Sequence, residues 1–85
     1  MGQKEKLIAR LKSKPKDFTF DEAETLLRYF GYSRDNKGKT SGSRVEFINN
    51  DLNSTIRLHR PHPRKELKEY QVKKIIKLLE KEDLI

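Results

Sequence analysis

The clearest pattern of apolar positions lies in the stretch "FTFDEAETLLRYFG" and predicts an amphipathic helix. Its apolar residues recur at i, i+3, i+4 and i+7, as on one face of a helix: Ala23, Leu26, Leu27 and Phe30. Thr19 and Glu22 have the spacing of a capping box at its start, and Gly31 is suited to its end. We therefore expect a well-defined helix with one buried face.

Two further stretches carry weaker or less sharply bounded helical stripes. Residues 3–13 place three apolar side chains opposite lysine and arginine, and Pro15 ends the pattern. These three residues are Leu7, Ile8 and Leu11. A helix with such a narrow apolar face is stable only when it packs against other parts of the chain. The last segment, "KELKEYQVKKIIKLLEKEDLI", has a longer stripe, and its helix starts somewhere between Arg64 and Glu69. That stripe comprises Val72, Ile75, Ile76 and Leu79.

Between the helices, apolar and polar residues alternate with a period of two, which is typical of strands. "SRVEFIN" and "STIRLHR" flank the polar turn "NNDLN", so together they predict a β-hairpin. The residues expected on its buried face are Val45, Phe47, Ile56 and Leu58. An irregular strand is also expected near Tyr32, and Pro61 and Pro63 end the hairpin because proline cannot donate to a ladder.

The predicted order is helix, helix, two or three antiparallel strands, helix, which is an α+β architecture. Eighty-five residues suffice for a single domain, here 1–85, with 1–16 as an N-terminal helix and connector and 18–85 as the core. Two helices cover the apolar face of the sheet. The opposite face is then open to solvent and carries Arg44, Arg57 and His59.

The formal net charge of +7 is concentrated in the predicted hairpin and its loops, since residues 32–65 alone carry +5. Such an excess indicates an anionic partner: nucleic acid, an acidic protein or a membrane surface. Charges on edge strands also prevent edge-to-edge pairing, which is the alternative explanation. No aromatic alternates with the cations, so contact with a phosphate backbone is favoured over base stacking. The candidate phosphate ligands are Arg34, Lys37, Lys39, Arg44, Arg57, Arg60, Arg64 and Lys65.

Several classes of protein are disfavoured by the sequence. There is no cysteine, hence no disulfide framework or thiolate metal site. No apolar run approaches the ~20 residues that span a bilayer, and the N-terminus has no signal-peptide core. We therefore expect a cytoplasmic protein without a membrane partner. "GKT" at 38–40 lacks the glycine spacing of a phosphate-binding loop.

Both histidines lie in "IRLHRPHPRKEL", as His59 and His62. Zinc would need a third and a fourth ligand, and the chain has no cysteine and no other histidine. Asp51 and Glu66 could contribute, but no recognised spacing supports them, so no metal or other cofactor is expected. Cleavage of RNA needs a base for the 2′-OH proton, an acid for the leaving oxygen, and cations for the transition state. Histidine, with an unperturbed pKa of ~6.5, suits the first two roles. Exposed histidines without any such role are also common.

The succession of a helix, "DNKGKTSGSRVEF", a turn, "IRLHRPHPRKEL" and an amphipathic helix resembles the HicA family of bacterial toxins over about residues 20–80. The resemblance implies an αβββα fold like that of double-stranded-RNA-binding domains, with an extra N-terminal helix here. It also implies metal-independent mRNA cleavage as part of a type II toxin–antitoxin system, and inhibition by a HicB-type antitoxin. From the resemblance together with the charge distribution, we expect the RNA-binding residues to be Lys37, Lys39, Ser43, Arg57, Arg60, Arg64 and Lys65.

The family relies on a strand histidine for catalysis, and Arg44 stands at that position here. Arginine cannot act as a base because its pKa lies above ~12, but it can hold the scissile phosphate. Three possibilities remain open. His59 or His62 takes over the base role; His62, which matches the family's later histidine, only assists; or the protein binds RNA without cutting it. A basic face that serves an acidic protein partner is a further alternative.

Overall fold

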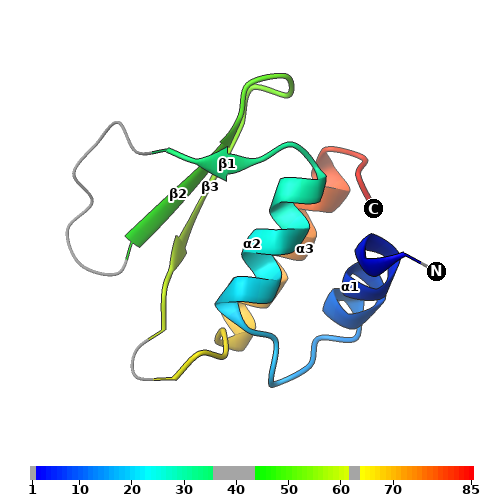
Figure 1. Cartoon of the computed structure of the whole chain (residues 1–85), viewed down its shortest axis with the longest axis vertical. Helices are drawn as coiled ribbons and strands as arrows, with labels where there is room; N and C mark the ends of the chain where they lie inside the picture. Colours follow the sequence, from blue (N-terminus) through cyan, green and yellow to red (C-terminus); the bar gives the residue numbers. More distant parts are fainter. Residues whose placement is uncertain (1, 36–43, 62–63) are drawn as a thin grey trace.

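The computed structural model describes residues 2–35, 44–61 and 64–85. In these residues the chain forms helices α1 (Gln3–Lys12), α2 (Phe20–Tyr29) and α3 (Glu69–Lys81). It also forms strands β1 (Ser33–Arg34), β2 (Arg44–Asn49) and β3 (Ser54–His59). The strands make an antiparallel sheet in the order β1-β2-β3 (Figure 1). The predicted α+β, αβββα arrangement with an additional N-terminal helix is therefore confirmed.

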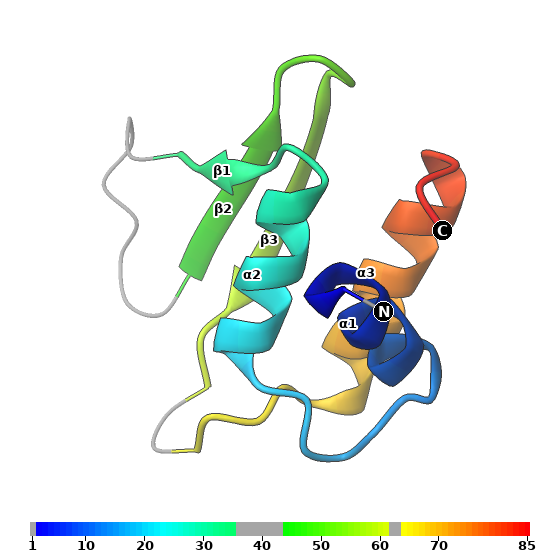
Figure 2. The ribbon, with the colours of Figure 1, turned by 45° about the vertical axis from the view of Figure 1, so that its right-hand side comes forward.

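The molecule has three layers, with the sheet on one side, α2 and α3 in the middle and α1 on the far side (Figure 2). Helix α1 contacts both α2 and α3, and its Leu7 and Leu11 are buried there. The core between the layers includes Phe47 and Leu58 from the sheet. Helix α1 therefore covers the sides of α2 and α3 that face away from the sheet, and it leaves the outer face of the sheet uncovered. No helix in the described ranges is long and apolar enough to cross a bilayer.

The start of α2 follows the predicted capping box. The Thr19 hydroxyl accepts from the Glu22 N–H at 3.1 Å, and the Glu22 carboxylate accepts from the Thr19 N–H at 3.0 Å. The same carboxylate receives the Arg10 Nε at 2.6 Å. The hydrogen bond from Arg10 lowers the pKa of Glu22, and it ties α1 to the cap of α2. Glu22 therefore both caps the start of α2 and holds α1 against it.

The end of α2 depends on a backbone conformation that favours glycine. Gly31 has φ of +92°, and a Cβ there would lie 3.1 Å from the Asn49 amide nitrogen. That amide donates to the Phe30 carbonyl at 2.8 Å, and its oxygen accepts from the Leu52 N–H at 3.1 Å. Asn49, at the end of β2, therefore fixes both the end of α2 and the start of the hairpin turn.

Most residues of the helical stripes are buried as predicted, but Ile8 of α1, Phe30 at the end of α2 and one residue of α3 are only half-buried. Val72, Ile75 and Leu79 are buried, whereas Ile76 is only half-buried at the edge of the core. The buried side of α3 includes Gln71 instead, which is 3% exposed. Helix α3 therefore presents a polar side chain to the edge of the sheet, where it forms hydrogen bonds with the backbone of His59.

The short strand β1 is held to α2 by an ion pair. Arg34 donates to both carboxylate oxygens of Glu24, each at 2.7 Å, and Arg28 also contacts Glu24 at 3.0 Å. The Glu24 side chain is only 11% exposed. The hydrogen bond from Arg34 is the main cause of a lowered pKa at Glu24, and the same hydrogen bond raises the pKa of Arg34.

Replacing Glu24 with glutamine is expected to lower the free energy of unfolding at pH 7 by about 1.5–3 kcal/mol, because two charge-assisted hydrogen bonds are weakened. The Glu24 pKa is lower in the folded than in the unfolded chain, so this stabilisation is present above about pH 4.3. It is lost as the pH falls through the lower folded-state pKa. Urea unfolding at pH 7 and pH 3 measures both effects, and the difference between variant and wild type should shrink at pH 3.

The matched control is Glu46→Gln, which removes a carboxylate from another strand ion pair. Arg57, the partner of Glu46, is 67% exposed, so this pair is expected to contribute less than about 1 kcal/mol. Equal losses from the two variants would contradict the role assigned to Glu24.

Candidate nucleic-acid interface

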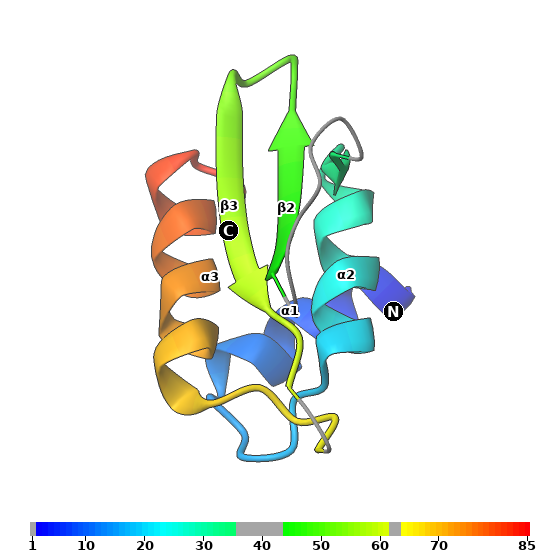
Figure 3. The same cartoon turned by 90° about the vertical axis from the view of Figure 1, so that its left-hand side faces the viewer.

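One face of the sheet carries exposed polar side chains, and no helix among the described residues covers it. Burial alternates along β3, where Ser54, Ile56 and Leu58 are buried while Thr55, Arg57 and His59 are exposed. Figure 3 looks onto β2 and β3, with α2 and α3 lying behind and to either side. The prediction of an open face that bears Arg44, Arg57 and His59 agrees with this arrangement.

Arg44 and His59 are direct partners across the β2–β3 ladder. The backbone N–H and C=O of His59 both bond to Gln71, on the side away from β2. The pair is therefore a non-hydrogen-bonded one, in which Cα atoms lie only ~4.5 Å apart and side chains project together. Arg44 and His59 are therefore direct neighbours on the open face.

Gln71 holds the backbone of His59 from outside the sheet. Its Oε1 accepts from the His59 N–H at 2.7 Å, and its Nε2 donates to the His59 carbonyl at 3.1 Å. The two bonds replace those that a neighbouring strand would make at this edge. Lys74, one turn further along α3, donates to the Arg57 carbonyl at 2.7 Å. Helix α3 therefore fixes the strand that carries His59.

The other predicted cations differ in how free their charges are. Arg57 is paired with Glu46 across the ladder at 2.6 Å, and Arg34 is held by Glu24. Arg60 lies over the Phe20 ring, 5.1 Å from its centroid. No ion pair within the described ranges engages Arg44, Arg60, Arg64 or Lys65. Among the predicted cations that the structure describes, the uncompensated charge therefore lies at Arg44, Arg60, Arg64 and Lys65.

Residues 64–67 are fixed by backbone hydrogen bonds to the start of α2. The Phe20 N–H donates to the Lys65 carbonyl at 3.0 Å, and the Leu67 N–H donates to the Phe18 carbonyl at 2.7 Å. Leu67 is buried, while the side chains of Arg64 and Lys65 are exposed. The start of α2 therefore positions two of the predicted RNA-binding cations.

Four predicted site residues lie outside the described residues: Lys37, Lys39, Ser43 and His62. Residues that the sequence did not single out are Gln71, Lys74 and Glu24. The one available signal for Gln71 was a polar residue next to Val72, on the apolar stripe of the last helix. Within the described parts of the chain, no cluster of three or more histidine, aspartate or glutamate side chains is placed to hold a metal ion.

An antiparallel sheet with helices on one face and an open cationic face on the other defines a fold like that of double-stranded-RNA-binding domains. A family model described as the HicA toxin of bacterial toxin–antitoxin systems matches residues 20–80. The chain therefore belongs to the HicA toxin family and is the toxin of a toxin–antitoxin pair, whose partner is an antitoxin. Helix α1 lies outside the matched residues. Comparison with curated proteins gave no match, and neither did comparison with solved structures.

Proposed function

We propose that this toxin is an endoribonuclease that binds mRNA on the open face of β2 and β3 and cleaves it without a metal ion. The observation that carries the proposal is the cross-strand pair of Arg44 and His59 on that face. Arg44 contacts the scissile phosphate, and His59 transfers protons. An antitoxin of the HicB type inhibits the enzyme by covering the same face.

The reaction is an attack of the ribose 2′-oxygen on the adjacent phosphorus. The 2′-OH gives its proton to a base, the bond from phosphorus to the 5′-oxygen breaks, and that oxygen takes a proton from an acid. The products are a 2′,3′-cyclic phosphate and a 5′-hydroxyl, with no change of oxidation state. Imidazole can serve in either proton transfer, and the Arg44 guanidinium stabilises the charge that develops on the phosphate. His62 is the candidate for the second transfer.

Incubation of a long mRNA with the protein in EDTA is expected to give fragments that end in a cyclic phosphate. Arg44→Ala should slow cleavage at least ~10-fold. It should also reduce the slope of the logarithm of the RNA-binding constant against the logarithm of salt concentration by about one, because one phosphate contact is lost. Fragment sizing and filter binding over a range of salt concentrations measure the two effects. Lys6→Ala is the matched control, because it removes one exposed charge from α1, on the far side of the molecule.

The alternative function is an RNA-binding module without catalysis, which the arginine at the family's histidine position favours. Intact RNA that is retained in a salt-sensitive way would establish that alternative. RNA that is neither cut nor retained at low salt would exclude both functions and would leave the cationic face to an acidic protein.

A further inference from the structure

A groove of about 1140 Å³ adjoins the open sheet face where β3 ends. Residues 14–17 of the connector after α1 line it on one side, and residues 64–72 line it on the other, apart from Lys65. His59 and Pro61 line its sheet end. A groove of this size exceeds the ~300–1,000 Å³ of a typical small-ligand site, so it fits an extended ligand better than a single metabolite.

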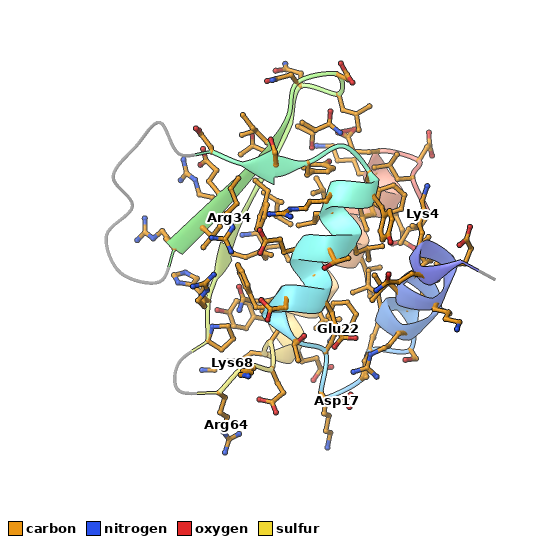
Figure 4. The ribbon with its side chains drawn as sticks, in the orientation of Figure 1. Lys4, Asp17, Glu22, Arg34, Arg64 and Lys68 are labelled. Carbon is orange, nitrogen blue, oxygen red and sulfur yellow. The ribbon has the colours of Figure 1, made fainter. Side chains whose placement is uncertain are left out.

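The groove carries cations that have no partners inside it. Lys14, Lys16, Arg64 and Lys68 are all exposed, and none joins an ion pair within the described ranges. Figure 4 places Arg64 and Lys68 at one end of the molecule, near Asp17.

The carboxylates of the groove are fewer and are mostly neutralised by residues outside it. Asp17 is paired with Arg10 at 3.1 Å, and Glu69 with Lys73 at 3.3 Å. Glu66 is the one groove carboxylate without an ion pair among the described residues. The field in the groove therefore favours an anionic ligand.

Tyr70 adds an aromatic ring to these charges. It lines the groove from the first turn of α3, and it is 58% exposed, whereas the tyrosine in the core, Tyr32, is 2% exposed. The Tyr70 ring contributes little to the core, and it lines the same groove as Lys68 and Arg64. Single-stranded nucleic acid binds where a cationic groove also presents aromatic rings on which bases stack.

We propose that the groove binds a single-stranded segment of RNA that flanks the cleavage site. Tyr70 stacks on a base, and Lys14, Lys16, Arg64 and Lys68 contact phosphates. Because His59 lines both the groove and the open face, a strand that passes Arg44 continues directly into the groove. This inference rests on the proposed function for the identity of the ligand. It also gives the N-terminal segment, which lies outside the family match, a part in substrate binding.

The test uses a short single-stranded RNA whose 2′-hydroxyls are all methylated, so that binding is measured without cleavage. Tyr70→Ala is expected to weaken binding ~5- to 100-fold, since stacking contributes ~1–3 kcal/mol per base. Tyr70→Phe should bind nearly as well as wild type because the ring is kept. Tyr29→Ala is the matched control: Tyr29 is 45% exposed, lies on α2 and does not line the groove.

A second variant tests the charges of the connector. The double variant Lys14→Ala, Lys16→Ala should reduce the slope of the logarithm of the binding constant against the logarithm of salt concentration by about two, because two phosphate contacts are lost. Equal binding by Tyr70→Ala and wild type would overturn the proposal, as would tighter binding of duplex than of single-stranded RNA. If Tyr70→Ala loses affinity for an acidic peptide of the antitoxin but not for RNA, the groove binds the antitoxin instead.

These experiments distinguish failure of RNA binding in the groove from failure of RNA cleavage. Methylated RNA that binds through Tyr70, together with intact unmodified RNA, would support the groove and refute cleavage. Fragments that form at the wild-type rate in Tyr70→Ala, with unchanged affinity for the methylated RNA, would refute the groove and leave cleavage in place.

Discussion

Replacing His59 with glutamine is expected to lower the rate of RNA cleavage by ~10²- to 10⁴-fold, the usual contribution of general acid–base catalysis. Glutamine is polar and of similar length, but it cannot accept and release a proton at neutral pH. The His59 side chain is exposed, and its backbone is held by Gln71, so the substitution leaves the strand in place. The affinity for RNA should change only a few-fold, because Arg44 and the groove cations remain.

Single-turnover cleavage of a defined RNA, with the methylated analogue for affinity, separates the two quantities. Thr55→Ala is the matched control, because Thr55 is exposed on the same face of the same strand and has no acid–base chemistry. Cleavage at the wild-type rate in His59→Gln would remove this histidine from the mechanism and leave His62 as the candidate. A loss of affinity as large as the loss of rate would make His59 a binding residue.

We propose that His59, directly opposite Arg44 on the ladder, takes the place of the histidine that the family resemblance leads one to expect on β2. A histidine on β2 could act as the base itself, whereas a guanidinium cannot. In an antiparallel pair, the residue directly opposite projects to the same side, so a proton-transfer group on β3 occupies nearly the same space as one on β2. The proposed exchange keeps an imidazole next to a cation and swaps the strands that carry them.

The hairpin and its neighbouring helices could be predicted from the sequence because their signals are local. The period of two in β2 and β3 fixes which residues face the core, and the polar turn between them fixes which strands pair. The turn is one residue shorter than the predicted "NNDLN", because Asn49 pairs with Ser54 as the last residue of β2. The capping box and Gly31 likewise lie within a few residues of the helix ends that they define. From these patterns, the open face and the identity of its exposed residues followed.

The interactions that complete the site could not be predicted, because they join residues far apart in the chain. Gln71 reaches the backbone of a residue twelve positions earlier, and Glu24 holds a residue ten positions later. Neither contact produces a periodic pattern in the sequence. For this reason the sequence predicts Arg34 to be a free phosphate ligand, although Glu24 holds it in the structure. The groove arises in the same way, since the connector near residue 15 meets the start of α3 only after folding.

Replacing Phe47 with alanine is expected to lower the free energy of unfolding by about 3–5 kcal/mol, a large share of the ~5–15 kcal/mol of a typical domain. Phe47 is fully buried beneath the sheet, opposite Ile56, with its ring centroid 6.1 Å from that of Phe20. Its loss leaves a cavity between the sheet and α2. Thermal unfolding should occur more than ~10 °C lower, and urea unfolding gives the free energy.

The neighbouring residue, Ile48, is the matched control because it lies on the opposite face of the same strand. It is only half-buried, so Ile48→Ala is expected to cost about 1 kcal/mol. A large difference between the two variants means that one face carries the core while the other is free to bind a ligand. Equal costs would mean that both faces are covered in solution, and the surface on which Arg44 and His59 are proposed to meet RNA would then not exist.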